Sequence, residues 1–418
     1  MNRATEAADR AGISTQCCIA GGGPAGLVLG YLLARAGVRV IVLEKHADFL
    51  RDFRGDTIHP STLTVLEDLG LLDEFLALPH QEVQQLTGDV YGQDVTLADF
   101  RHVRAARPFL VLVPQWDFLS FIARHAQRLP NFTLHLGAKA TGVIQEGDAV
   151  TGVQVQAGDT AYAIRADLVV AADGRHTTLR GSAGLASVDT GAPIDVLWFR
   201  LPRDAANDPA RTGGTMRPGA MLVTLNRDSY WQCAFVIPKG SLEHLQAQGI
   251  AAFRERIAGV ADFLADSVHA LSSWDDVKLL SVQISHMPRW YRRGLLCIGD
   301  AAHAMSPVGG VGINLAIQDA VAAANLLAPP LLQGTLRTED LHAVQARREW
   351  PARVTQRMQV AIQNEVLSPV LARTDAPARM PVPVKLLQRL PLLRRIPARL
   401  IGIGVRPERV RLPVATTP

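Results

Sequence analysis

Cysteine is scarce in this chain, with four residues among 418. Cys17, Cys18, Cys233 and Cys297 form no CxxC pair and have no histidine-rich segment at metal-ligand spacing. This pattern argues against a bound metal and against a redox-active dithiol. Three of the four stand in apolar, strand-like runs, so buried free thiols are expected, which suits a reducing cytoplasm.

A large net charge and long apolar runs are also absent. The formal net charge is +4 and no repeat interleaves aromatic with basic residues, so nucleic acid is not an expected partner. No stretch of 18 clean apolar residues is present, which argues against a transmembrane helix. The apolar run 17–33 follows acidic residues and is interrupted at 21–24 by Gly-Gly-Gly-Pro, which argues against a secretory signal. We expect a cytoplasmic protein, either a monomer or a homodimer.

A glycine-rich turn lies between a short apolar run, 16–20, and a segment with helical spacing, 27–36. Its sequence contains GxGxxG: Gly21 allows a tight turn, Gly23 lets the backbone approach a pyrophosphate, and Gly26 lets helix and strand pack closely. The flanking Pro24 and Ala25 open the helix, whose N-terminus attracts phosphate. These features predict a dinucleotide site.

An acidic residue completes this unit. Glu44 ends the next β-branched run, 38–43, and follows Gly26 by 18 residues, where an acid reaches the ribose hydroxyls. Its charge disfavours a 2′-phosphate, so the dinucleotide expected at this unit is FAD or NAD and not NADP.

The remaining periodicities predict an α/β chain. We expect strands at 132–136, 140–146, 150–157, 161–166, 168–172, 196–201, 231–237 and 295–298. We expect helices at 60–77, 116–128, 242–256 and 312–327, the first capped by Ser61 or Thr62. The sequence divides into a discontinuous Rossmann-like nucleotide-binding domain (14–79, 112–187 and 280–350), an inserted, mostly antiparallel β-sheet substrate domain (80–111 and 188–279) and C-terminal helices (351–418).

Two further motifs identify the cofactor. Residues 167–180 read DLVVAADGRHTTLR and residues 295–314 read LLCIGDAAHAMSPVGGVGIN. With the glycine turn, they resemble the three fingerprints of the para-hydroxybenzoate hydroxylase-like flavoprotein monooxygenases, over about residues 14–350. The resemblance implies that the first domain binds FAD non-covalently.

The resemblance also implies which residues hold FAD. Asp173 and Gly174 would form a strand-end turn beside the cofactor, with Arg180 as an ion partner there. Asp300, after Gly299, would accept from a ribityl or ribose hydroxyl. The loop Pro307, Gly309 and Gly310 would lie against the isoalloxazine ring, and Gly312, Ile313 and Asn314 open the following helix. Further matches are Arg54 and Gln115. Lys45, an expected adenosine contact, stands where many relatives carry Arg, and Val311 stands where relatives often carry glutamine. His303 is interpreted as a loop anchor.

The family chemistry begins with hydride transfer from NADH or NADPH to FAD. O2 then forms a C4a-hydroperoxyflavin, which transfers one oxygen to an electron-rich aromatic or conjugated substrate. No second GxGxxG is present for the nicotinamide, which suits transient binding. A prenyl or alkene reductase and a non-catalytic flavin-binding protein remain alternatives; a flavin halogenase is disfavoured because no Trp-x-Trp-x-Ile-Pro segment is present.

The sequence says less about the wall of the substrate pocket and about the role of the C-terminal segment. Trp198, Phe199, Met221, Trp231 and Phe235 are candidates for an apolar pocket wall, although strand alternation lets only about half face it. The segment 385–406 is apolar and basic, with Pro391 and Pro397 dividing it into short helices. We interpret it as a cap on the substrate side in preference to a membrane-surface patch.

Overall fold

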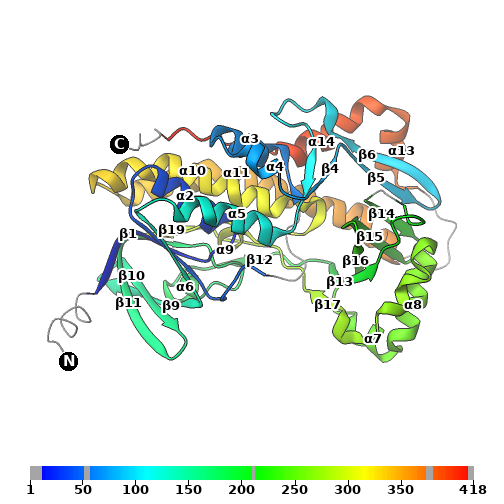
Figure 1. The fold of residues 1–418 in the computed structure, drawn as a ribbon, viewed down its shortest axis with the longest axis horizontal. Helices are drawn as coiled ribbons and strands as arrows, with labels where there is room; N and C mark the ends of the chain where they lie inside the picture. The colour runs from blue at the N-terminus through cyan, green and yellow to red at the C-terminus, as the bar shows by residue number, and fades with distance from the viewer. Residues whose placement is uncertain (1–11, 51–56, 210–211, 373–379, 413–418) are drawn as a thin grey trace.

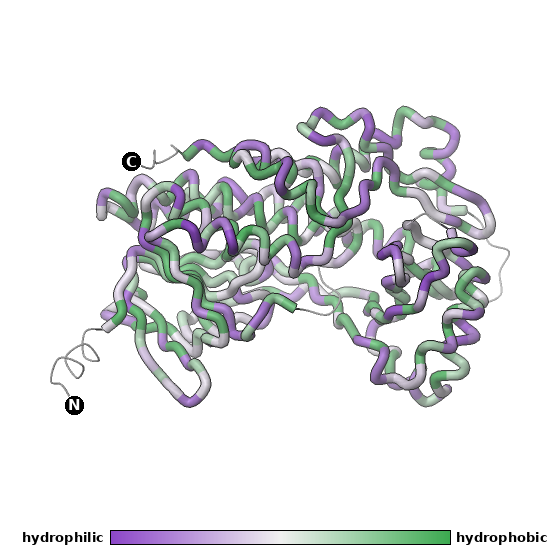
Figure 2. Tube along the Cα trace, in the orientation of Figure 1, coloured by the Kyte–Doolittle hydropathy of each residue, from purple (hydrophilic) through white to green (hydrophobic). Residues whose placement is uncertain are grey.

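The computed structural model describes residues 12–50, 57–209, 212–372 and 380–412. Two sheets, each with helices against it, lie at opposite ends of an elongated molecule, and the long helices α10 (Val311–Gln333) and α11 (Thr338–Ile362) run beside the larger one (Figure 1). Hydrophobic residues are frequent along the central strands of the larger sheet (Figure 2). The fold is a mixed α/β arrangement, as the sequence predicts.

The larger sheet has the strand order β19-β20-β11-β1-β2-β8, with β10 and β9 continuing from β11. Its strands are β1 (Ile13–Ala20), β2 (Val40–Glu44), β8 (Phe132–Leu136), β9 (Ala138–Glu146), β10 (Ala149–Ala157), β11 (Thr160–Ala171), β19 (Tyr291–Arg292) and β20 (Leu295–Cys297). The central pairs β1–β11, β1–β2, β2–β8 and β11–β20 are parallel. β2 is buried along its whole length, which explains why its sequence is apolar up to Glu44.

Helices cover this sheet and connect its strands. They are α2 (Pro24–Arg35), α3 (Pro60–Asp68), α4 (Leu72–Leu76), α5 (Gln115–Gln127), α6 (Thr178–Ser182), α9 (Asp300–His303), α10 and α11. α10 packs against both α2 and α11. By length and composition α10, with the turn before it, could cross a membrane, but 83% of its most apolar window is buried inside the protein. It is therefore a core helix.

The second sheet has the order β17-β13-β16-β15-β14-β5-β6, and all its pairs except β14–β5 are antiparallel. Its strands are β5 (Gln85–Val90), β6 (Gln93–Asp99), β13 (Ile194–Pro202), β14 (Gly213–Arg217), β15 (Ala220–Asn226), β16 (Tyr230–Pro238) and β17 (Lys278–Leu280). One face packs against α7 (Leu242–Ala247), α8 (Gly249–Val260) and the 3-10 turns η2 (Asp262–Leu264), η3 (Ser267–Ala270) and η4 (Trp274–Asp276).

Smaller elements join the two sheets. β3 (Thr57–Ile58), β7 (Leu110–Leu112) and β4 (Gln81–Val83) form a three-stranded sheet, β12 (Val188–Asp189) pairs with β18 (Ser285–His286), and η1 is Phe100–His102. After α11 the chain continues through a π-helical turn (Gln363–Leu367), α12 (Ser368–Ala372), α13 (Val382–Arg389), η7 (Pro391–Arg394) and α14 (Arg395–Gly402). α13 and α14 pack against β6, so the C-terminal segment does cap the second sheet.

Several predicted elements differ from those observed. The helix expected at 60–77 is two helices separated near Gly70, whose φ is +71°, and the helix expected at 242–256 breaks before Gly249, whose φ is +85°. The residue preceding α3 is His59, so neither Ser61 nor Thr62 is its cap.

Other differences concern continuity. The two strands expected at 161–166 and 168–172 are one strand, β11, because its N-terminal half pairs with β10 and its C-terminal half with β1 and β20. The helix expected at 312–327 continues to Gln333. The division expected at residue 350 falls inside α11. All four cysteines are buried and free, as expected.

Candidate active site

The glycine turn connects β1 to α2. Gly21 has a φ of +108°, and a Cβ there would lie 2.4 Å from the carbonyl oxygen of Ala172. At Gly26 a Cβ would lie 1.9 Å from the carbonyl oxygen of Gly21. At Gly23, in contrast, a Cβ would meet no atom of the described residues within 4 Å. Two glycines are therefore required by close packing, and the third leaves open space at the helix N-terminus.

Glu44 lies at the end of β2, directly beside this turn. One carboxylate oxygen accepts from the amide of Gly22 at 3.0 Å and the other from the amide of His46 at 3.0 Å. The side chain is buried, with a relative exposure of 6%. The acid expected to reach the ribose thus also joins the glycine turn to the segment that follows β2.

The second motif meets the first at the end of β11. Asp173 follows Ala172, and its Oδ1 is buried without a hydrogen-bond partner among the described residues. Burial raises the pKa of this carboxyl group above its usual value. Gly174 has a φ of +87° and open space where a Cβ would be. A buried acceptor next to open space suits a hydroxyl or N–H donor of a ligand.

Arg180 connects the second motif to the third. Its guanidinium donates to two backbone carbonyls, those of Ala301 at 3.0 Å and Arg175 at 3.1 Å, and the ion pair expected of Arg180 beside the cofactor stays a prediction. Asp300 stands exposed at the first position of α9. Arg180 donates to the carbonyl of Ala301, the residue after Asp300, and therefore helps to fix the start of α9.

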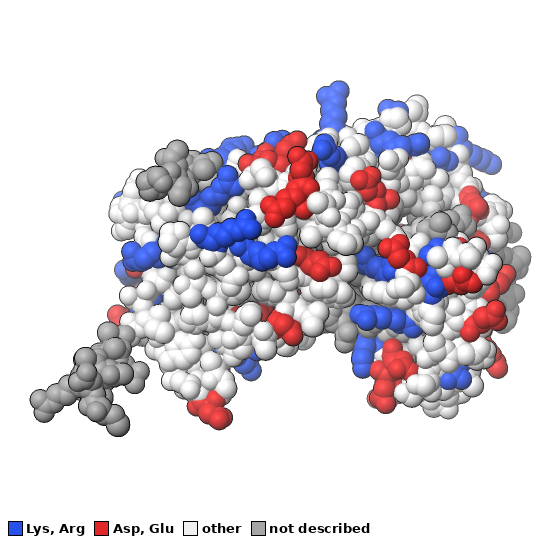
Figure 3. Space-filling view, in the orientation of Figure 1, with Lys and Arg blue, Asp and Glu red and all other residues white. Residues whose placement is uncertain are grey.

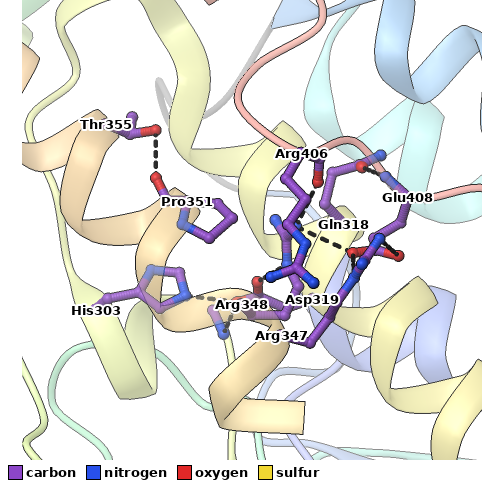
Figure 4. Close-up of polar contacts among 10 residues, drawn as sticks. His303, Gln318, Asp319, Arg347, Arg348, Pro351, Thr355, Arg406 and Glu408 are labelled. Carbon is purple, nitrogen blue, oxygen red and sulfur yellow. Dashed lines mark hydrogen bonds and ion pairs between the residues drawn. The ribbon is translucent and has the colours of Figure 1, made fainter. Parts of the chain in front are cut away.

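A buried charge network supports the same turn (Figure 4). Asp319, on α10, accepts from the amide of Gly299 at 3.1 Å and contacts His303 Nε2 at 2.5 Å. Its other oxygen accepts from Nε of Arg348 at 2.9 Å, and Arg348 also contacts Glu408 at 3.4 Å. Burial alone would raise the pKa of Asp319, but His303 and Arg348 lower it. His303 therefore anchors the third motif, as interpreted from sequence.

Three glutamines of α11 and the π-helical turn hold the loop that follows α9. Gln356 Nε2 donates to the carbonyls of Ser285 (2.9 Å) and Ala304 (2.8 Å). Gln359 Nε2 donates to the carbonyls of Ser306 (2.8 Å) and Val308 (2.9 Å). Nε2 of the third, Gln363, donates to Ser306 Oγ at 2.6 Å. We call these three residues the glutamine ladder; the sequence analysis missed them.

Asn314 ties the loop 307–312, which we call the glycine loop, to the segment before α3. Its Oδ1 accepts from the amide of His59 at 2.8 Å and from Thr62 Oγ1 at 2.7 Å, and its Nδ2 donates to the carbonyl of Thr57 at 2.9 Å. The Asn314 side chain is thus engaged within the protein. Gly310 has a φ of +62°, and a Cβ there would lie 3.2 Å from Thr57.

His59 is a further residue that the sequence analysis did not select. It is fully buried beside Gly310, and its Nδ1 lies 2.7 Å from the carbonyl oxygen of Ile401 in α14. Since a carbonyl only accepts, Nδ1 carries the proton of the neutral ring. Burial lowers the pKa of His59 to about 4. It connects the C-terminal helices to the glycine loop.

The predicted substrate residues divide between the two faces of the second sheet. Trp231, Phe199 and Phe235 lie in the core beneath α8. Trp231 contacts Phe263 edge to face, and the other two contact Phe253 in the same way. Trp198 and Met221 lie on the opposite face, in the cluster that includes Val308. Strand alternation therefore turns only these two toward the glycine loop.

An apolar cavity of about 370 Å³ adjoins the glycine loop. Val308, Gly309 and Val311 line one side, with Met358, Gln359 and Ile362 of α11. The remaining lining comes from α13, η7 and α14, including Leu386, Leu393, Ile396, Leu400 and Ile401. The loop expected to lie against a flavin ring thus also borders an apolar chamber.

Comparison with known proteins identifies the family. Residues 14–358 match the family model described as "FAD binding domain". A 6-methylpretetramide 4-monooxygenase from Streptomyces rimosus is 35% identical over 404 residues, which cover 96% of this chain and 95% of the relative. The chain belongs to the para-hydroxybenzoate hydroxylase-like family of FAD-dependent monooxygenases.

One further relative of this FAD-dependent monooxygenase and one similar solved structure agree with the family assignment. A 12-dehydrotetracycline 5-monooxygenase/anhydrotetracycline 6-monooxygenase, also from Streptomyces rimosus, is 29% identical over 72% of this chain and 60% of the relative. The structure of p-nitrophenol 4-monooxygenase from Pseudomonas putida superimposes with a TM-score of 0.75 at 21% identity, covering 93% of this chain and 97% of that one. At this low identity, the similarity to the p-nitrophenol enzyme shows a shared fold only.

FAD fits the residues present. The first turn of α2 has free backbone N–H groups and the open space at Gly23 for a pyrophosphate, with Glu44 beside it. Asp173, whose Oδ1 has no hydrogen-bond partner among the described residues, lies after the end of β11. The exposed Asp300 lies after the end of the neighbouring strand β20. Lys45 is exposed and Gln115 opens α5, whereas Arg54 lies outside the described residues.

Proposed function

We propose that this FAD-dependent monooxygenase hydroxylates a phenolic ring of a multi-ring aromatic polyketide, with NADH or NADPH as the reductant. The observation that carries the substrate class is the apolar cavity beside the glycine loop, which lies within the 300–1,000 Å³ range of small-molecule sites. The 6-methylpretetramide and anhydrotetracycline enzymes supply the chemical class.

The cofactor-binding roles follow from the positions described above. Gly21, Gly23 and Gly26 would hold the pyrophosphate at the N-terminus of α2, and Glu44 would bind the adenosine ribose. Asp173 and Asp300 would accept from hydroxyls of the ribityl half, and 307–314 would hold the ring. When bound, FAD accepts a hydride from the nicotinamide and activates O2. The protein supplies position and a dry environment.

Residues around the cavity would orient the substrate. Val308, Val311 and Ile362 offer an apolar surface for fused rings, and among the described residues no Asp, Glu, Lys or Arg lines the cavity. Trp198 and Met221 would extend this wall from the second sheet. Phe199, Trp231 and Phe235 serve the core beneath α8 and are not proposed as substrate contacts. The four buried thiols suit a reducing cytoplasm as the location.

Product analysis under ¹⁸O2 tests the substrate class. The FAD-loaded enzyme is incubated with 6-methylpretetramide, anhydrotetracycline or a single-ring phenol, with NADH or NADPH. We expect a product heavier by one labelled oxygen from a multi-ring compound. A product heavier by two hydrogens would indicate an alkene reductase. Turnover of the single-ring phenol alone would contradict the multi-ring proposal while leaving the monooxygenase assignment intact.

We also propose that substrate controls reduction. Gly309 and Gly310 have positive φ angles in the loop against the ring site, and glycine gives such a loop the freedom to move. Stopped-flow measurement of FAD reduction, with and without the substrate found above, should show faster reduction in its presence. Equal rates would exclude gating.

A further inference from the structure

The C-terminal helices expose an unusual number of apolar side chains. The relative exposures of Val382 and Leu392 are 77% and 70%, which is more than for any other large hydrophobic residue among those described. Leu386, Leu390 and Ile396 are 48%, 50% and 55% exposed. The inner side of the same helices is anchored, because Val384 and Ala398 are buried in core clusters. The exposed side chains are therefore the outer face of a packed cap.

Basic residues flank this apolar face. Between Val382 and Gly402 the chain has five Lys or Arg residues and no Asp or Glu. Arg394 is partly buried, where its Nε donates to the carbonyl of Leu387 at 2.9 Å. The other four, Lys385, Arg389, Arg395 and Arg399, are exposed. Lys and Arg side chains gather over the α13 and α14 end of the molecule (Figure 3).

We propose that this C-terminal surface, formed by Val382, Leu386, Leu390, Leu392 and Ile396 with Lys385, Arg389, Arg395 and Arg399, binds an anionic lipid membrane. Apolar side chains next to Lys and Arg on short helices are the pattern of a helix that lies in the membrane interface. The apolar side chains enter the acyl boundary, and the cations contact the negatively charged headgroups, each adding to the affinity. The cap on the second sheet and the membrane contact are thus two faces of one element.

Charge favours lipid over a second copy of this chain. In a twofold dimer the same patch faces itself, so the four exposed cations would approach four identical cations without an acidic partner from this segment. Like charges placed together in an interface are unfavourable. An anionic bilayer satisfies both the apolar and the basic side chains.

The surface adjoins the mouth of the apolar cavity. Leu386 and Ile396 are exposed and also line the cavity. Bound in this way, the enzyme would turn the cavity toward the lipid. A multi-ring apolar substrate could then enter from the membrane; this consequence alone rests on the proposed function.

Vesicle co-sedimentation of the FAD-loaded enzyme tests the surface directly, without any substrate. The vesicles contain phosphatidylcholine alone or an equal mixture of phosphatidylcholine and phosphatidylglycerol. We expect binding to the anionic vesicles, weaker binding to the neutral ones, and a decrease as salt is raised. Absence of binding to anionic vesicles at low salt would overturn the proposal.

Two variants separate the apolar and basic contributions. Val382→Ser/Leu392→Ser removes side chains that do not line the cavity, and Lys385→Gln/Arg389→Gln/Arg395→Gln/Arg399→Gln removes the exposed charges. We expect each to lower the partition coefficient by roughly tenfold or more. The first variant loses apolar side chains that enter the acyl boundary, and the second loses the attraction of its cations to the anionic headgroups. Matched controls are Leu279→Ser and Lys139→Gln, at exposed positions away from the surface, which should bind as wild type.

Light scattering tests the alternative that a second copy of this chain covers the surface. If wild type fails to bind vesicles and Val382→Ser/Leu392→Ser converts a dimer into a monomer, the surface joins two copies and the lipid proposal is wrong. Variants that bind vesicles as well as wild type would also contradict it. Unchanged FAD content and thermal unfolding in both variants would show that they are folded.

Discussion

His303 and Asp319 form a fully buried pair in which Nε2 of the imidazole lies 2.5 Å from Oδ2 of the carboxylate. The same carboxylate accepts from the amide of Gly299 and from Arg348 (Figure 4). One side chain of α10 thus joins the turn before Asp300, the end of α9 and the middle of α11. We expect it to act on cofactor binding by positioning Asp300.

Replacing Asp319 with Asn should destabilise the protein and weaken FAD binding. The change removes the nearer of the two carboxylates around the buried Arg348 and leaves only Glu408, at 3.4 Å, which costs up to about 3–5 kcal/mol of unfolding free energy. Urea unfolding of the apoprotein and FAD titration measure the two effects. Asp148→Asn is the control, because the Asp148–Arg293 pair is exposed and its loss should be nearly neutral. Equal stability of the two variants would show that the network is unimportant.

Replacing Gln359 with Leu should loosen the glycine loop. The carbonyls of Ser306 and Val308 lose their donor, at a cost of about 1–3 kcal/mol. We expect faster hydrogen exchange in 304–310 and more hydrogen peroxide per reductant consumed. Arg357→Gln, at an exposed position of the same helix, should change neither. Wild-type exchange in Gln359→Leu would refute a positioning role for this member of the ladder.

Glu44→Ala and Asp300→Ala should affect FAD differently. Loss of the charged hydrogen bond at Glu44 should weaken FAD binding by about 1.5–3 kcal/mol, roughly ten- to a hundredfold in Kd, and should free the amides of Gly22 and His46. Asp300→Ala should lose more flavin or raise the share of reductant lost as peroxide, because the position proposed for Asp300 is beside the reactive half of FAD. Dialysis and peroxide assays compare them. Equal and normal coupling of reduction to product in both variants would contradict this ordering.

His59 should make stability depend on pH between about 4 and 6.5. Burial lowers its pKa from 6.5 to about 4 in the folded protein, so the unfolded chain binds the extra proton within that window. Stability is therefore lost as pH falls through 6.5, by up to about 3 kcal/mol at pH 4. His59→Gln should flatten this part of the urea-unfolding profile relative to wild type. A parallel profile would mean that His59 does not titrate as described.

Residues next to one another in the chain were predictable. The roles of Gly21 and Gly26 follow from a turn between adjacent elements, and the structure shows that a Cβ at either would collide with backbone. Glu44 could be placed because β2 directly follows α2. His303 as an anchor was also expected. In each case the required backbone conformation is set within a few residues of the motif.

Contacts between distant segments were not predictable. Arg348 and Glu408 reach Asp319 only because α11 and the C-terminal tail pack against α10, and His59 meets Ile401 across 342 positions. The π-helical turn of α11 sets the place of Gln363 in the glutamine ladder.

The sequence by itself determined the nucleotide fold, the FAD motifs and the positions of their glycines, because these depend on local backbone geometry. Tertiary structure decided which apolar residues face the glycine loop. Trp198 and Trp231 were equivalent candidates by composition, and the packing of α8 on one face of the sheet separated them. It also decided that the C-terminal helices are both a cap and an exposed surface, because burying one face of an amphipathic helix fixes what the other face presents to solvent.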